Sequence, residues 1–84
     1  MKRDFITFRS ITPAQQAQRI LHKGGVETQL QRTPRWMEQR GCGYCIRVPD
    51  RQAVDAVRLL RQGKIPFGRV YWLEEGQEPR EVSL

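Results

Sequence analysis

Two short amphipathic helix patterns most constrain how this chain of 84 residues can fold. The first follows Thr12, a good N-cap, has Pro13 at its first helical position and stops at Gly24. The second follows Asp50, another N-cap candidate, and stops at Gly63. In both patterns apolar residues recur at spacings of three and four, so each helix has one face that must be buried. A chain this short has room for only one domain in which to bury them.

Four strand patterns surround the two helices. They are rich in β-branched and aromatic residues or alternate between apolar and polar residues. They lie at residues 4–8, 26–30, 42–48 and 67–73. Two right-handed β-α-β units joined in this order predict an α+β, ferredoxin-like fold (βαββαβ), with a four-stranded antiparallel sheet and both helices on one face. We expect residues 1–73 to form a single domain and the acidic residues 74–84 to form a flexible C-terminal tail.

The positive charge of the chain is concentrated before residue 74. The net charge is +6, but four of the nine acidic residues lie after Leu73, which leaves the first 73 residues with 14 basic and 5 acidic side chains, or +9. Twelve of the 15 basic residues are arginine, whose planar guanidinium group suits phosphates and other oxyanions. The charge therefore predicts an anionic partner.

The sequence also bears on the compartment. No apolar run approaches the ~20 residues needed to cross a bilayer. The first residues, 1–4, lead into a strand pattern and not into the apolar core of a signal peptide. We therefore expect a cytoplasmic protein with no membrane partner. Its two cysteines would then be reduced, redox-active or metal-binding, and not a structural disulfide.

The most reactive-looking residues lie in the segment 33–45, between the second and third strand patterns. Cys42 and Cys45 form a C-x-x-C motif there. The thiolate is the nucleophilic form of cysteine, and nearby arginines lower its pKa. Cys42, at the end of the loop, is the predicted nucleophile. Cys45 is either a resolving thiol or a small buried residue, because residues three apart on a strand face opposite sides.

Several neighbours would support a thiolate or a bound anion at Cys42. They are Arg35, Arg40, Arg47, Gly43, Thr33 and Pro34. Pro34 restrains Thr33 to an extended conformation and stiffens the start of the loop, so that Arg35 could lie over the Cys42 sulfur. Gly43 has no side chain, which would leave room beside the sulfur for a large soft atom.

Two other chemistries of a C-x-x-C motif fit this sequence less well. A zinc site needs two more ligands at suitable spacing, and the chain offers only His22 and carboxylates. We expect no metal and no cofactor within one chain, and a zinc shared by the cysteines of two chains stays an alternative. A thioredoxin-like motif would open a helix, whereas the sequence at 46–49 favours a strand and ends in a proline.

Short motifs spread over about residues 4–73 resemble those of a known family. They are Phe5-Ile6-Thr7-Phe8 with Ser10, a helix ending near Gly24-Gly25-Val26, Thr33-Pro34-Arg35, and Cys42-Gly43 leading into Ile46-Arg47. The family is a small bacterial one, described as putative Se/S carrier protein-like. The resemblance implies a carrier, and not a stand-alone enzyme, that holds sulfur or selenium on Cys42 as a persulfide-type adduct. Donor and acceptor proteins would be its partners. Cys45 is additional to the family's single cysteine, which leaves a two-thiol redox role open.

Two further classes of function remain open from the sequence. An RNA-binding domain would use the open face of the sheet, with Phe5 and Tyr44 as stacking aromatics, although the usual pair of aromatics on the third strand is missing. A nucleic-acid partner is therefore less expected. A protein-interaction module, for example a homodimer, would use Trp36 as an anchor, whereas Trp72 is expected in the core.

Overall fold

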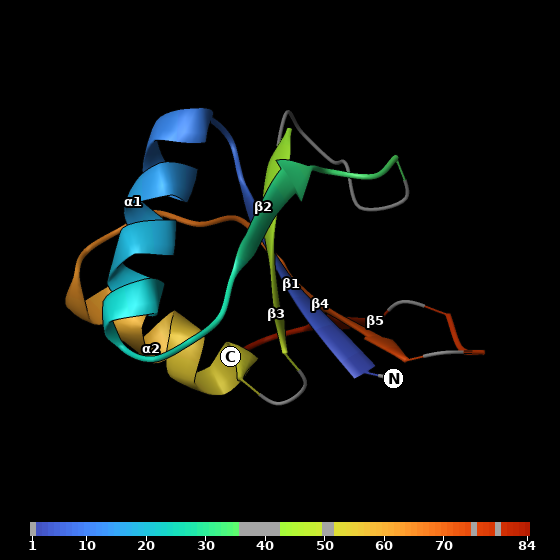
Figure 1. Ribbon diagram of the computed structural model, residues 1–84. Helices are drawn as coiled ribbons and strands as arrows, with labels where there is room; N and C mark the ends of the chain where they lie inside the picture. The colour runs from blue at the N-terminus through green and yellow to red at the C-terminus, as the bar shows by residue number, and fades with distance from the viewer. Residues whose placement is uncertain (1, 36–42, 50–51, 75, 79) are drawn as a thin grey trace.

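The computed structural model describes residues 2–35, 43–49, 52–74, 76–78 and 80–84. The elements in chain order are β1 (Lys2–Phe8), α1 (Ile11–Lys23), β2 (Gln29–Arg32), β3 (Tyr44–Pro49), α2 (Ala53–Gln62), β4 (Val70–Glu74) and β5 (Arg80–Val82). The strands form one five-stranded antiparallel sheet in the order β2-β3-β1-β4-β5. Both helices lie on one face of this sheet (Figure 1). The α+β class predicted from the sequence is confirmed.

The predicted number of strands was wrong, because β5 adds a fifth strand to the sheet. β5 lies in the segment expected to be a tail and pairs with β4, placing Val82 opposite Val70. Val82 and Leu84 pack against the core, and this tertiary contact outweighs the weak local pattern of a short acidic segment. The ferredoxin-like topology is not confirmed for this larger sheet. The flexibility of residues 74–84 and the domain limit at residue 73 stay predictions.

Several element boundaries differ from the sequence patterns. The N-cap of α1 is Ser10, in an extended conformation, so Pro13 falls inside the first helical turn, where its missing N–H is tolerated. The N-cap of α2 is Gln52, and the predicted cap, Asp50, lies outside the described residues. β4 begins only at Val70.

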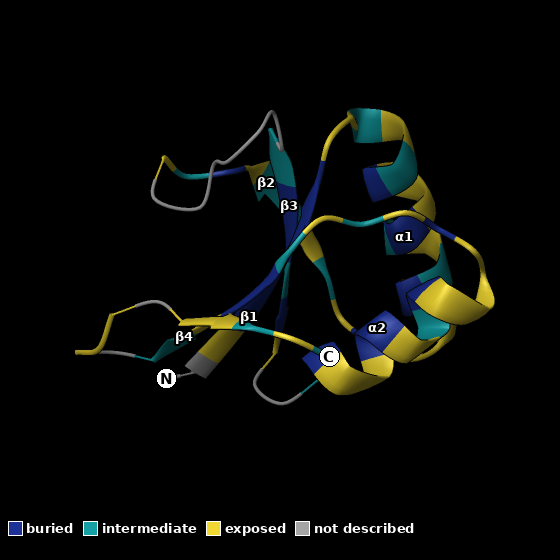
Figure 2. Ribbon diagram, turned by 180° about the vertical axis from the view of Figure 1, so that it is seen from behind, coloured by how far each residue is buried: buried dark blue, intermediate teal, exposed yellow. Residues whose placement is uncertain are grey.

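The main core lies between the helices and the sheet. Its sheet residues are Ile6, Phe8, Ile46, Val48 and Val70, and its principal helix residues are Ala14, Ala17, Leu21, Ala56, Val57 and Leu60. The buried residues gather where the helices meet the sheet and along β1 and β3 (Figure 2). The helix residues recur at spacings of three and four, so the amphipathic pattern in the sequence identified the buried face of each helix.

The two helices meet at their C-terminal glycines. A Cβ atom added at Gly24 would lie 2.6 Å from Cδ1 of Leu59, and one added at Gly63 would lie 2.6 Å from Cδ1 of Ile20. Both glycines have ordinary negative φ angles, of −81° and −82°. These two glycines therefore do not adopt the left-handed conformation that is usual for a glycine at the end of a helix. They matter because they have no side chain, which lets the two helices pack closely.

A buried carboxylate on β1 fixes the start of α2. The backbone N–H of Ala53 donates to Oδ2 of Asp4 at 3.2 Å, and Asp4 is only 2% exposed. Gln52, at the N-cap, contributes no side-chain cap of its own. The N-terminus of a helix carries unpaired N–H groups and a partial positive charge, so a carboxylate is well placed there.

The sheet face that points away from the helices carries a second, smaller cluster. It consists of Phe5, Cys45 and Tyr71, one from each of three adjacent strands, with Leu73 packed against it. All three are buried. Trp72, which was expected in the core, is instead 42% exposed. Cys45 thus lies inside an apolar layer and not at the surface of the sheet.

Candidate functional site

The predicted reactive segment connects β2 to β3, and its two ends are held together. The backbone N–H of Thr33 donates to the carbonyl oxygen of Gly43 at 3.0 Å, one residue beyond the register pair of Arg32 and Tyr44. Cys42 and Arg40 lie outside the described residues. The structure therefore defines the two ends of the loop whose sequence contains the predicted nucleophile, Thr33 at one end and Gly43 at the other.

Cys45 is fully buried in β3, opposite Thr7 of β1 and Gln31 of β2. Burial raises the pKa of its thiol, because an apolar environment disfavours the thiolate. The nearby polar side chains of Gln31 and Thr33 act in the opposite direction, but burial has the larger effect. Cys45 is therefore held as a neutral thiol near neutral pH, the less nucleophilic form.

Thr33 links the backbone of the loop to the Cys45 thiol. Its main chain bonds to Gly43, and its side chain is buried, with 8% of the residue exposed. Oγ1 has no hydrogen bond of ordinary geometry within the described part of the chain. The Thr33 side chain therefore lies beside the Cys45 sulfur, which is only a weak hydrogen-bond donor and acceptor. Pro34, which follows, is half-buried.

The predicted arginines do not gather around Cys45. Arg35 is exposed just after Pro34, whereas Arg47 is half-buried on the same sheet face as Cys45, two residues further along β3. Within the described residues neither arginine forms an ion pair. Some of the predicted supporting residues have side chains that the structure describes. Of these, Thr33 is the one that lies beside the Cys45 thiol.

Two contacts near the loop were not predicted from the sequence. Gln31 contacts the Cys45 thiol, and the guanidinium carbon of Arg32 lies 5.3 Å from the centre of the Tyr44 ring. At this range the ring attracts the cation, so the positive charge of Arg32 is held at the base of the loop. The register of β2 against β3 places both contacts, and the alternation in the sequence could have revealed them once this pairing was assumed.

The structure also bears on the alternatives that the sequence left open. Phe5 belongs to the cluster on the face away from the helices, whereas Tyr44 packs against the core on the helix side, so the two do not form one stacking platform. Cys45 lies in a strand, and the motif does not open a helix. Among the residues that the structure describes, no group of three or more His, Cys, Asp or Glu could hold a metal ion. No helix in the same part of the chain is long and apolar enough to span a membrane.

The fold and the loop together define a small α+β protein whose thiol motif spans the end of the β2–β3 connection and the start of β3. Comparison with protein families agrees with this class, because the family model described as "Putative Se/S carrier protein-like" matches residues 4–71. The match runs from β1 into β4 and includes both cysteines, so the chain belongs to this family, as the sequence motifs indicated. No curated protein and no solved structure gives a significant match.

The raised pKa of Cys45 predicts a stability that falls at alkaline pH. The unfolded chain ionises this thiol near the ordinary value of about 8.5, whereas the folded protein ionises it only at higher pH. The contribution of the neutral thiol is therefore complete below the ordinary pKa and is lost as the pH rises towards the folded-state pKa. We expect the free energy of unfolding to fall in that window by up to about 1.4 kcal/mol per pH unit.

Urea unfolding of the native protein and of Cys45→Ala, at pH values from about 7 to 10, isolates this effect. Every other ionisable group is common to both proteins, so its contribution cancels in the difference. The variant should lose the alkaline decline that belongs to Cys45. Parallel curves for the two proteins would show that the folded state imposes no penalty on the Cys45 thiolate.

Proposed function

We propose that this protein carries sulfur or selenium on Cys42 as a persulfide-type adduct. The observation that carries the proposal is the family match, which spans residues 4–71 and includes Cys42. The burial of Cys45 supports assigning the chemistry to Cys42, because a buried neutral thiol is a poor nucleophile. The partners would be donor and acceptor proteins in the cytoplasm, and Cys45 would be structural or would resolve an oxidised Cys42.

The loading step would be a sulfane-sulfur transfer. The Cys42 thiolate attacks the outer sulfur of a donor persulfide, R–S–SH. A new S–S bond forms at Cys42, the S–S bond of the donor breaks, and the donor leaves as the thiolate R–S⁻. The product is the Cys42 persulfide, and a selenium donor would give its selenium analogue. Attack by an acceptor thiolate on the outer atom reverses the same steps and returns Cys42 to a thiolate.

The surroundings of the loop support an anionic cargo. Arg35 is exposed at the start of the loop and Arg32, the last residue of β2, is held at its base, so two positive charges lie where the chain enters the loop. A Cβ atom added at Gly43 would have no neighbour within 4 Å, which leaves space beside the residue that follows Cys42. Cations near a thiolate or persulfide favour the anionic form. Arg40 and Arg47 are proposed to add to this field.

The scaffold that presents the loop is proposed to be a ferredoxin-like unit with one added strand. Support comes from the chain order of β1 to β4 with the two helices, from the pairing order β2-β3-β1-β4, and from the position of both helices on one face. β5 then extends this unit next to β4.

Intact-mass spectrometry after exposure to glutathione persulfide tests the carrier proposal. We expect the native protein and Cys45→Ser to gain about 32 Da, the mass of one sulfur atom, and to lose it on treatment with a reductant. Cys42→Ser should gain nothing. The selenium analogue of the donor should add about 79 Da to the same two proteins.

The matched pair of serine variants makes the outcome specific. An adduct that persists in Cys42→Ser and disappears in Cys45→Ser would move the chemistry to Cys45. The absence of any adduct on the native protein, under conditions in which a small thiol is converted, would contradict the carrier function.

A further inference from the structure

The outer edge of β2 offers main-chain groups for one more strand. Among the strands that the structure describes, β2 is the last on its side of the sheet, with β3 as its neighbour. In an antiparallel pair, alternate residues direct their N–H and C=O groups to the partner strand. Thr33 bonds to Gly43, so the alternation assigns Gln31 and Gln29 to the same inward set. The N–H and C=O groups of Leu30 and Arg32 therefore point away from β3, along the outer edge.

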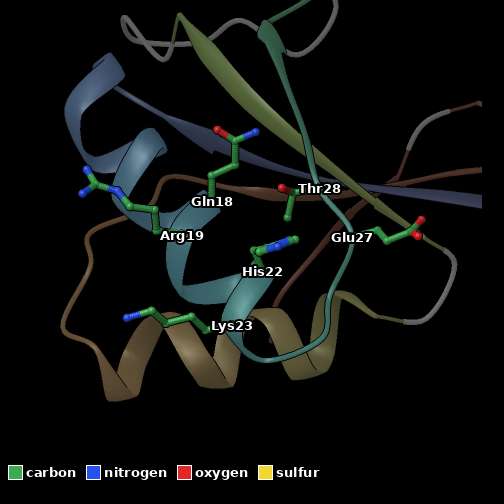
Figure 3. Close-up of a pocket in the computed structure, with 6 residues that line it drawn as sticks. All are labelled: Gln18, Arg19, His22, Lys23, Glu27 and Thr28. Carbon is green, nitrogen blue, oxygen red and sulfur yellow. The ribbon is translucent and has the colours of Figure 1, made fainter.

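A polar hollow adjoins this edge. It has a volume of about 550 Å³ and is lined by Gln18, Arg19, His22, Lys23, Glu27 and Thr28. In Figure 3, Gln18 and His22 from α1 and Thr28 from the chain leading into β2 point into the space between the helix and the strand. Arg19 and Lys23 extend outward from α1, and Glu27 points away from the helix. A strand added at β2 would thus have hydrogen-bonding side chains beside it on the helix side.

Among the residues with described positions, the charges around the edge are mostly positive. Arg19 and Lys23 on α1, together with Arg32 and Arg35 at the far end of β2, are all exposed, whereas Glu27 is the acidic residue that lines the hollow. A second copy of this chain would bring the same positive edge against itself. Charge complementarity therefore favours an acidic occupant.

We propose that the edge of β2 and the hollow beside α1 form a docking site for an extended acidic segment of a partner protein. The segment adds a strand next to β2 by bonding to the main chain of Leu30 and Arg32, and its acidic side chains lie near Arg19 and Lys23. The identification of that partner as a sulfur or selenium donor or acceptor rests on the proposed function. Because β2 leads directly into Thr33 and the reactive loop, a partner bound at this edge lies alongside the strand that presents the loop.

Amide hydrogen exchange, followed by NMR on the full chain, tests the docking site. The probe is a synthetic peptide of alternating glutamate and valine residues. The Leu30 and Arg32 amides should exchange at least about tenfold more slowly at saturating peptide, because they gain hydrogen-bond partners. The Gln31 and Thr33 amides, directed to β3, should be slow in both samples. Peptide binding that leaves the exchange of Leu30 and Arg32 unchanged would overturn strand addition.

Protection of Leu30 and Arg32 without peptide, increasing with protein concentration, would show that a second copy occupies the edge, and this too would overturn the proposal. A peptide of alternating glutamine and valine controls for charge and should not bind at the same concentration.

Charge variants locate the acidic side chains of the probe. Arg19→Gln with Lys23→Gln should weaken peptide binding roughly three- to thirtyfold, as expected for two exposed ion pairs. Arg58→Gln with Arg80→Gln makes the same change in net charge on α2 and β5 and should leave binding nearly unchanged. If both double variants weakened binding equally, the affinity would depend on the overall charge of the protein and not on this site. That result would overturn the proposal. These measurements need no adduct on Cys42, so their failure is separate from failure of the carrier function.

Discussion

Replacing Asp4 with alanine is expected to destabilise the folded protein by about 2–4 kcal/mol. Asp4 is 2% exposed, and its carboxylate accepts the N–H of Ala53 at the start of α2. Removing it leaves a buried helix N-terminus without that acceptor and opens a small cavity beside β1. The loss should appear as a lower free energy of unfolding in urea, measured by far-ultraviolet circular dichroism.

Two further variants separate charge from shape in this experiment. Asp4→Asn keeps an acceptor oxygen and the volume but removes the negative charge, so it should fall between the native protein and Asp4→Ala. Arg3→Ala changes the exposed neighbour on β1 and should shift stability by less than about 0.5 kcal/mol. If Asp4→Ala unfolds at the same urea concentration as the native protein, the carboxylate does not stabilise α2.

Ending the chain before Arg80 is expected to lower the free energy of unfolding by about 2–4 kcal/mol. This is a large effect for a segment that the sequence predicted to be a flexible tail. The truncation removes Val82 and Leu84, which pack on the core, and uncovers Val70, only 3% exposed in the sheet. It also removes the hydrogen bond from the Arg61 guanidinium to the Leu84 carbonyl oxygen. Thermal and urea unfolding of the truncated and full chains measure the difference.

The matched control for the truncation is Arg69→Gln. Arg69 pairs with Glu81 of β5 at 2.8 Å, but both side chains are well exposed, so this ion pair should contribute less than about 1 kcal/mol. A truncated protein as stable as Arg69→Gln would show that β5 is held only loosely, in agreement with the flexible tail that the sequence predicted.

The sequence predicted that the two helices and the first four strands exist because their patterns are local, but it placed the second strand at 26–30 and the fourth at 67–73, whereas β2 is Gln29–Arg32 and β4 is Val70–Glu74. Apolar spacing identified the buried faces of both helices, and alternation identified β3. The cap on α2 could not be predicted in the same way, because Asp4 is 49 residues from Ala53 in the chain and only the sheet brings the two together. The glycines that end the helices were located correctly but serve helix packing, a contact that a sequence pattern does not reveal.

Prediction of the site was limited by the same distinction between local and distant contacts. The C-x-x-C motif and the arginines are visible in the sequence, and so is the family resemblance that the family match confirms. The burial of Cys45 depends on Phe5 and Tyr71, which arrive from two other strands. Its contact with Gln31 depends on the register of β2 against β3. Spacing along the chain left both alternatives for Cys45 open, whereas the sheet places it in an apolar layer.

The central place of β1 has a consequence for synthesis on the ribosome. This strand is made early, yet it lies between β3 and β4 and pairs Ile6 with Val70 near the other end of the chain. Such distant pairings form slowly and only after most of the polypeptide has emerged. Until then the apolar side chains of residues 5–8 remain without their final neighbours, with both strand edges open. The sheet can therefore be completed only once residues 70–74 are available to pair with β1.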